Sequence, residues 1–271
     1  MAVKSFEETV LTAEAIKDFQ ICSLLYDYRH AQNLSEPIGG RELLAMRYEN
    51  TLKRVASFFF YKKQSGSAPS YNAILNRWEK LWFPKDLTIS DIAVEQNETW
   101  HGNIHSYNTD AAVALLKFHE DFYDTDWDPI LIDENFLVPM TRDIRLSGRF
   151  DLVLRRGDEH KVVKYSGRLG RPAINKMMVD FALMRHAFEI RHDWSKRTSY
   201  HLYDLGSSKP GFVRARPTNT DLNALYYWAH QTATQDVYAP RRGLTAYCRG
   251  CPFDAPCSTF DKYPEIEPLD K

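Results

Sequence analysis

Hydrophobic residues recur at helical spacing through the first part of the chain. Between Thr12 and Gln32, apolar side chains return every three to five positions, which places them on one face of an α-helix. The segment HGNIH, with His101 and His105, contains glycine and asparagine and is expected in a surface loop, not on a metal-binding helix. Three further helices are predicted from the same spacing, at Leu43–Lys63, Ser70–Trp82 and Ala111–Phe122.

The pattern changes near residue 126, where short apolar runs alternate with turn residues. Such runs predict three successive antiparallel strands, at Ile130–Val138, Ile144–Arg155 and His160–Tyr165. An amphipathic helix is predicted next, at Ala173–Ile190, followed by a hairpin of strands Ser199–Leu205 and Gly211–Arg216. A last helix is expected from an N-cap at Asp221 to about Thr234. Strands and helices in this order predict an α/β fold.

No repeat, low-complexity stretch or linker divides the sequence. We therefore predict a single domain over residues 1–271. It would have a mainly helical part at 1–125, a core at 126–240, and a cysteine segment and tail at 241–271.

Composition narrows the class of protein. The chain has 271 residues, 44% of them hydrophobic and 26% charged, which is enough to bury a core without disulfides. A net charge of -1 argues against a nucleic-acid binder that depends on a global positive field, but it does not exclude binding through a local basic groove. No run reaches the roughly 20 apolar residues of a membrane span, and the N-terminus is not an export signal. We expect a soluble cytoplasmic protein with no membrane partner, in the host cytoplasm if a virus encodes it.

The four cysteines, Cys22, Cys248, Cys251 and Cys257, favour metal ligation. Two disulfides are disfavoured because the cytosol keeps thiols reduced. Structural zinc usually takes two close cysteine pairs, and only one close pair is present, whereas an iron–sulfur cluster tolerates a remote fourth thiolate. Either metal would join Cys22 to the C-terminal segment. Closing a loop of over two hundred residues in this way is worth roughly 5 kcal/mol in the loop-entropy picture.

Three segments together resemble the RecB-like nucleases of the PD-(D/E)XK superfamily. They are the helix around Cys22, the segment LSGRFDLVLRRGDEHKVVKYSGR and the C-terminal C-x2-C-x5-C. The match is to members with an iron–sulfur staple, such as the CRISPR-adaptation exonucleases and exonuclease V. The resemblance implies a mixed sheet flanked by helices, a helical N-terminal region, and a 4Fe–4S cluster on the four cysteines. Structural zinc is the alternative.

The resemblance also implies where the active site would lie, and this chain departs from it there. The family uses two carboxylates to hold Mg²⁺ or Mn²⁺ and a lysine to polarise water. The first carboxylate is kept as Asp151, but the second falls on Lys164, the lysine on Ser166 and a helical glutamine on Ala182. Strand alternation places residues 162, 164 and 166 on one face, so we expect Lys164 to pair with Asp151 in place of a divalent ion. Bound Mg²⁺ or Mn²⁺ is therefore doubtful.

Three functions remain open. The first is a catalytically degenerate nuclease-like protein that serves as a DNA-binding or assembly subunit. The second is an active Mg²⁺- or Mn²⁺-dependent DNA exonuclease whose site has migrated to Glu134 and Asp180. The third is a structural interaction protein of a larger complex, for example a viral one, whose partners are other proteins. Four arginines next to these segments could contact DNA or be ordinary solvated charges: Arg168, Arg171, Arg241 and Arg242.

Overall fold

The structure is a computed structural model. It describes residues 9–34, 40–82, 99–167, 174–192, 197–206, 210–235, 248, 251–253 and 257, with the side chains of 40–44 and 99–105 excepted. These residues fall into two compact units. The terminal unit comprises Met1–Ile38, Pro139–Ser147 and Asn223–Lys271, and the central unit comprises Gly39–Val138 and Gly148–Leu222. The prediction of a single domain stays a prediction.

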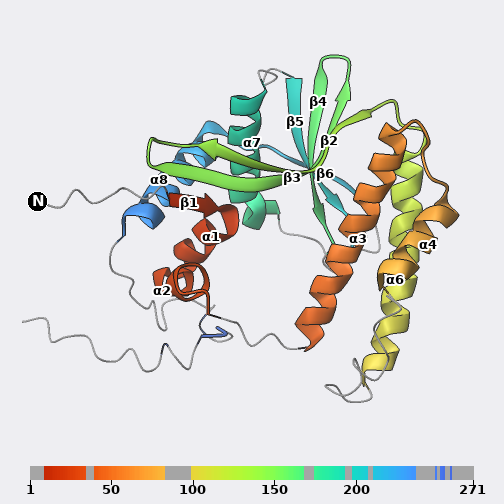
Figure 1. The fold of residues 1–271 in the computed structure, drawn as a ribbon, viewed down its shortest axis with the longest axis horizontal. Coiled ribbons are helices and arrows are strands. Elements are labelled where there is room, and N and C mark those ends of the chain that lie inside the picture. Colours follow the sequence, from red (N-terminus) through yellow and green to blue (C-terminus); the bar gives the residue numbers. More distant parts are fainter. Residues whose placement is uncertain are drawn as a thin grey trace, which may run out of the picture. The chain divides into compact units, whose positions relative to one another are not determined.

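The described residues form a mixed six-stranded sheet flanked by helices (Figure 1), which confirms the predicted α/β class. None of the described helices is long and apolar enough to cross a membrane. The elements in chain order are β1 (Thr9–Thr12), α1 (Ala13–Ile21), α2 (Ser23–Tyr26), the π-helix η1 (Asp27–Ala31), α3 (Gly40–Gln64), α4 (Tyr71–Trp82), α6 (Thr99–Phe122), β2 (Asp128–Pro139), β3 (Ile144–Arg156), β4 (Glu159–Ser166), the 3₁₀-helix η2 (Ile174–Met177), α7 (Met178–Arg191), β5 (Thr198–Asp204), β6 (Gly211–Ala215) and α8 (Asn219–Thr234).

The strand order is β1-β3-β4-β5-β6, and β2 also pairs with β3. β3 and β4 are antiparallel, as predicted, with a register from Leu152↔Val163 to Arg156↔Glu159. β5 runs parallel to β4, and the predicted hairpin of β5 and β6 is confirmed by an antiparallel register from Tyr200↔Ala215 to Asp204↔Gly211. α7 lies in the connection from β4 to β5, as expected for two parallel neighbours.

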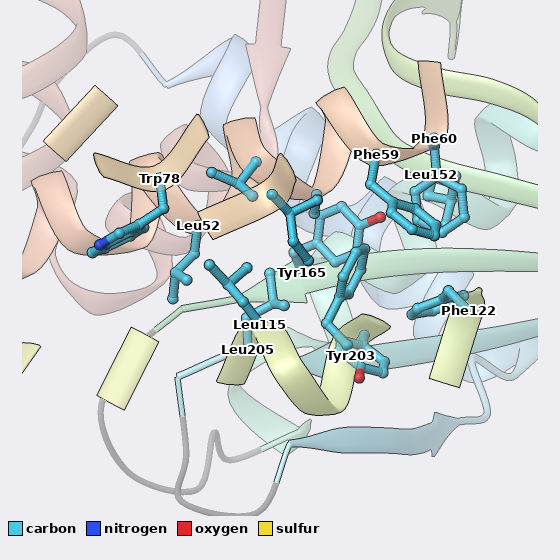
Figure 2. Packing of buried hydrophobic residues seen from close by; sticks show 14 of the residues in the cluster. Leu52, Phe59, Phe60, Trp78, Leu115, Phe122, Leu152, Tyr165, Tyr203 and Leu205 are labelled. Carbon is cyan, nitrogen blue, oxygen red and sulfur yellow. The ribbon is translucent and has the colours of Figure 1, made fainter. Parts of the chain in front are cut away.

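In the central unit, α3, α4 and α6 lie side by side and pack on one face of the sheet (Figure 1). Tyr165 and Tyr203 point from β4 and β5 into this core, where they meet the aromatic rings of α3 and α6 (Figure 2). α7 packs on the opposite face, because the ring centroid of Phe188 lies 5.9 Å from that of His160 in β4. Since alternate residues of a strand face opposite sides, Lys164 lies on the α7 face.

In the terminal unit, the predicted helix from Thr12 to Gln32 is interrupted, which corrects that prediction. Cys22 adopts an extended conformation between α1 and α2, with φ -160° and ψ 122°, and the chain then continues into η1. The wider turn of η1 brings Arg29 and His30 back to the buried Asp18, whose Oδ2 lies 2.6 Å from Arg29 and 2.8 Å from His30. Apolar periodicity did not reveal this break because buried residues continue on both sides of it.

Three local predictions were wrong or incomplete. β1, which pairs in parallel with residues Ile144–Ser147 of β3, was not predicted, because four residues carry too little pattern. The segment HGNIH was predicted as a loop, but α6 begins at Thr99 and includes it, so the single Gly102 does not end the helix. α8 begins at Asn219, and Thr218 caps it: Asp221 N bonds to Thr218 Oγ1, while Thr218 N donates to Asp221 Oδ2. Asp221 is thus the N3 residue of a capping box whose N-cap is Thr218.

Candidate functional site

Asp151 lies in β3 next to the end of the regular β3–β4 ladder, and its carboxylate is buried. Oδ2 accepts a hydrogen bond of 2.8 Å from the main-chain N–H of Tyr165 in β4. Only 7% of the side chain is exposed. The carboxylate thus satisfies a main-chain donor that would otherwise need a carbonyl partner. The hydrogen bond to the neighbouring strand holds the carboxylate in this position.

Arg149 compensates the charge of Asp151 and connects it to a second carboxylate. Its Nε lies 3.4 Å from Asp151 Oδ1, and its terminal nitrogen lies 3.0 Å from Asp133 Oδ1 in β2. Asp133 has a φ of +53°, a left-handed conformation that aspartate tolerates better than most residues. Sequence analysis missed both Asp133 and Arg149. Alternation in β2 could not have found Asp133, because the irregular backbone at that residue decides where its side chain points.

Lys164 is paired with Asp180 of α7, and the distance from Nζ to Oδ1 is 3.3 Å. The side chains are 23% and 12% exposed, so the pair is mostly buried. Burial lowers the pKa of Lys164, but the carboxylates of Asp180 and Asp151 together raise it more, so that the pKa lies above its ordinary value of 10.5. The ammonium therefore stays charged between two acidic groups. The predicted partner, Asp151, acts on Lys164 through its charge, while the ion pair itself is made with Asp180.

Ser166 and Ala182 lie where the resemblance implies catalytic groups. Ser166 is buried at the end of β4, and its carbonyl oxygen accepts a hydrogen bond of 2.6 Å from Leu205 N. Ala182 is fully buried in α7. The methyl group of Ala182 has no proton to transfer and no ligand atom, and the hydroxyl of Ser166 cannot carry the positive charge of a lysine.

Two glycines permit close approach around these residues. A β-carbon at Gly148 would lie 2.5 Å from Cζ of Phe136, so only glycine lets this ring of β2 rest against β3. A β-carbon at Gly167 would lie 2.7 Å from Cα of Glu49, which allows α3 to approach the end of β4. Both glycines thus act through packing next to Asp151 and Lys164.

Glu134, the proposed substitute carboxylate, is engaged elsewhere. Its Oε1 lies 3.0 Å from a terminal nitrogen of Arg191, and its side chain is 37% exposed. In the part of the chain that the structure describes, no three histidine, cysteine, aspartate or glutamate side chains are grouped in a way that could hold a metal ion. Among the described residues, the network at β2, β3, β4 and α7 includes three carboxylates and two cations: Asp133, Asp151, Asp180, Arg149 and Lys164.

The cysteines belong to the terminal unit, where the structure brings three of them to one small apolar cluster. Cys22, Cys251 and Cys257 pack against the core of Leu24, Leu25, Tyr28 and Phe253. The rings of Tyr28 and Phe253 have centroids 5.5 Å apart, which joins the N-terminal helices to the C-terminal segment. None of the four cysteines, Cys248 included, is in a disulfide. A set of thiols near one another suits a thiophilic metal centre.

The basic residues considered as DNA contacts cannot be placed. Arg168, Arg171, Arg241 and Arg242 all lie outside the described residues.

Comparisons with known proteins identify the fold and no closer relationship. Neither a known family nor a curated protein matches the sequence. Two solved structures are similar across almost the whole chain. A protein titled a putative exonuclease, from Eubacterium rectale, shares 10% identity with a TM-score of 0.50, over 92% of this chain and 93% of its own. SSO0001 shares 12% identity with a TM-score of 0.39, over 93% of this chain and 87% of its own. The first likeness shows a nuclease-like α/β fold.

Proposed function

We propose that this chain is a non-catalytic relative of the PD-(D/E)XK nucleases that serves as a DNA-binding or assembly subunit. One observation carries the proposal. The ammonium of Lys164 pairs with Asp180 and is acted on by the charge of Asp151, at a position where the resemblance implies a ligand of a divalent ion. A divalent ion held by Asp151 would be repelled by this positive charge, and the repulsion is strong in a mostly buried site.

The remaining contacts support this reading. Arg149 pairs with Asp151, the carboxylate of the family motif that this chain retains, and Tyr165 N donates a hydrogen bond to the other oxygen of Asp151. Ala182 and Ser166 supply neither the polar group nor the lysine of the motif. The carboxylates are thus neutralised by side chains of the protein itself, and the fold is stabilised without a metal at this position. The nuclease-like fold of the solved structure from Eubacterium rectale is consistent with a shared scaffold.

A 4Fe–4S cluster on Cys22, Cys248, Cys251 and Cys257 is part of the proposal, with zinc as the alternative. The cluster would supply a staple between the two ends of the chain. Its support is the donor set of four thiols, three of which pack on one cluster of buried side chains. Metal analysis and the visible absorption spectrum of protein purified without oxygen distinguish iron with sulfide from zinc.

The test is a nuclease assay on single- and double-stranded DNA with Mg²⁺ and with Mn²⁺. Wild-type protein with its thiol-bound metal should be compared with Asp151→Ala and with Asp158→Ala, a control whose carboxylate is 85% exposed. We expect the wild-type protein to cleave no more DNA than either variant does. Cleavage that Asp151→Ala abolishes and Asp158→Ala preserves would overturn the proposal in favour of an active exonuclease.

A DNA-binding measurement on the inactive protein distinguishes a DNA-binding subunit from an assembly subunit. Fluorescence anisotropy with labelled DNA at several salt concentrations should show an affinity that falls as salt increases, because phosphate contacts release counterions. An inactive protein without salt-dependent binding would point to the third function, an interaction protein whose partners are other proteins.

A further inference from the structure

β6 is the last strand in the order of the sheet, and no described strand pairs with its outer edge. Among the strands that the structure describes, β6 pairs only with β5. The other edge of β6 therefore has main-chain N–H and C=O groups that can pair with another strand. Natural sheets usually protect such edges with proline, bulges or inward-pointing charges. The sequence of β6, GFVRA, contains no proline. Its register with β5 is continuous over five residues, so the strand has no bulge.

Each face of β6 carries an exposed apolar side chain. Phe212 is 39% exposed and Val213 is 47% exposed. Phe212 is nevertheless held in place, because its ring centroid lies 4.9 Å from that of Tyr203 and 5.4 Å from that of Phe122. A fixed ring with an exposed surface loses little conformational entropy when it is covered, which suits a docking position.

The charged residue of β6, Arg214, and Arg216 just after the strand are both positive. Arg214 and Arg216 are exposed and make no ion pair in the part of the chain that the structure describes. Two arginines elsewhere in the central unit differ, because Arg156 of β3 lies 2.9 Å from Glu159, and Arg197, just before β5, lies 3.5 Å from Asp158. Arg214 and Arg216 thus place two cations without an ion pair among the described residues at this end of the sheet.

We propose that the outer edge of β6 binds an extended, acidic segment of a partner protein, which adds a seventh strand to the sheet. Main-chain hydrogen bonds along the edge would supply affinity. A carboxylate opposite Arg214, and β-branched or aromatic residues opposite Phe212 and Val213, would supply specificity. This inference stands on β6 alone and does not require the site at Asp151 to be inactive.

A nucleic acid fits this edge less well. Asp126, just before β2, and Glu159, at the start of β4, carry carboxylates that already hold Arg156. They lie near β6, because Lys161 Nζ is 3.9 Å from the ring centroid of Trp127 and 5.5 Å from that of Phe212. They would repel a phosphate backbone that followed the surface, whereas an added strand would contact β6 only. The open main-chain groups also match a peptide, which has the same groups in the same spacing.

The experiment is selection of random peptides on phage against the full chain, followed by binding and hydrogen-exchange measurements with the selected synthetic peptide. We expect peptides enriched in acidic, β-branched and aromatic residues and poor in proline. Binding should slow amide exchange in Gly211–Ala215. Arg214→Glu should weaken binding about tenfold, the loss of one charge-assisted contact. The control Arg197→Glu makes the same charge change in an exposed pair and should leave binding within about twofold.

Peptide backbone chemistry tests the strand pairing separately from charge. A peptide methylated at its central main-chain nitrogens keeps its carboxylates but loses donors, and it should not bind. Selected peptides without acidic residues, unchanged exchange in β6, or equal binding by the methylated peptide would each overturn the proposal. So would protection of β6 by single-stranded DNA in place of the peptide, or by a concentration-dependent dimer of the chain. Circular dichroism of Arg214→Glu confirms that the variant is folded.

Discussion

Replacing Lys164 with methionine is expected to destabilise the protein more than the loss of an exposed ion pair does. Methionine has a similar length and no charge, so packing changes little. The carboxylates of Asp180 and Asp151 would remain mostly buried after the loss of the Lys164 ammonium, while Arg149 would still pair with Asp151.

The geometry of the pair sets the size of this effect. Removing one member of a buried ion pair costs about 3–5 kcal/mol. The Lys164 and Asp180 side chains keep 23% and 12% exposure, and solvent reduces the cost, so we expect a loss of about 2–3 kcal/mol. Because the folded-state pKa of Lys164 is raised above 10.5, its contribution is fully present at neutral pH. It is lost only as the pH rises through that raised value.

The assay is urea unfolding at neutral pH, followed by circular dichroism. Arg197→Met is the matched control, because its pair with Asp158 is 66% and 85% exposed and should be worth less than about 0.5 kcal/mol. The double variant Lys164→Met with Asp180→Asn should be more stable than the sum of its single changes predicts, since neither charge is left without its partner. A loss in Lys164→Met no greater than in Arg197→Met would refute the role of Lys164 as a buried counter-ion.

Four further predictions follow from particular contacts. Lys164→Glu combined with Ser166→Lys restores the residue types of the nuclease motif and should create Mn²⁺ binding detectable by calorimetry; no gain would contradict the alignment of these positions. The pKa of His201 is lowered by burial to about 4, so the unfolded chain takes up a proton first. Stability should then fall by roughly 3 kcal/mol from pH 6.5 to pH 4 relative to His201→Gln, as measured by urea unfolding. Lys63 donates to three carbonyl oxygens at and after the end of α6, at 2.8, 3.2 and 3.0 Å, and Lys63→Met should cost about 2 kcal/mol. An equal stability of Lys63→Met and wild type would show that water replaces these bonds. Cys251→Ser should lower both bound metal and the melting temperature, with a loss of up to roughly 5 kcal/mol if the metal closes the long loop; unchanged metal content would remove that cysteine from the ligand set.

The amino-acid sequence by itself determined the α/β class and the strands that matter most for the site. β3, β4 and the β5–β6 hairpin lie within a few residues of their predicted bounds. Period-two alternation is a local property of the chain, so it also predicted that Lys164 would share a face with Ser166. The cysteine spacing likewise predicted an association of Cys22 with the C-terminal segment, and both are found on one apolar cluster.

Tertiary structure alone decided which charges meet. The sequence allowed Lys164 to pair with Asp151, but α7 places Asp180 against it, while Arg149 and Tyr165 N take the oxygens of Asp151. Likewise, Asp133 joins the network and Glu134 does not, because the left-handed backbone at Asp133 interrupts the alternation that the sequence leads one to assume. Periodicity reports which face a residue occupies, since this depends on near neighbours in the chain. The pairing of side chains depends on how elements distant in sequence are packed, and that information appears only when they are brought together.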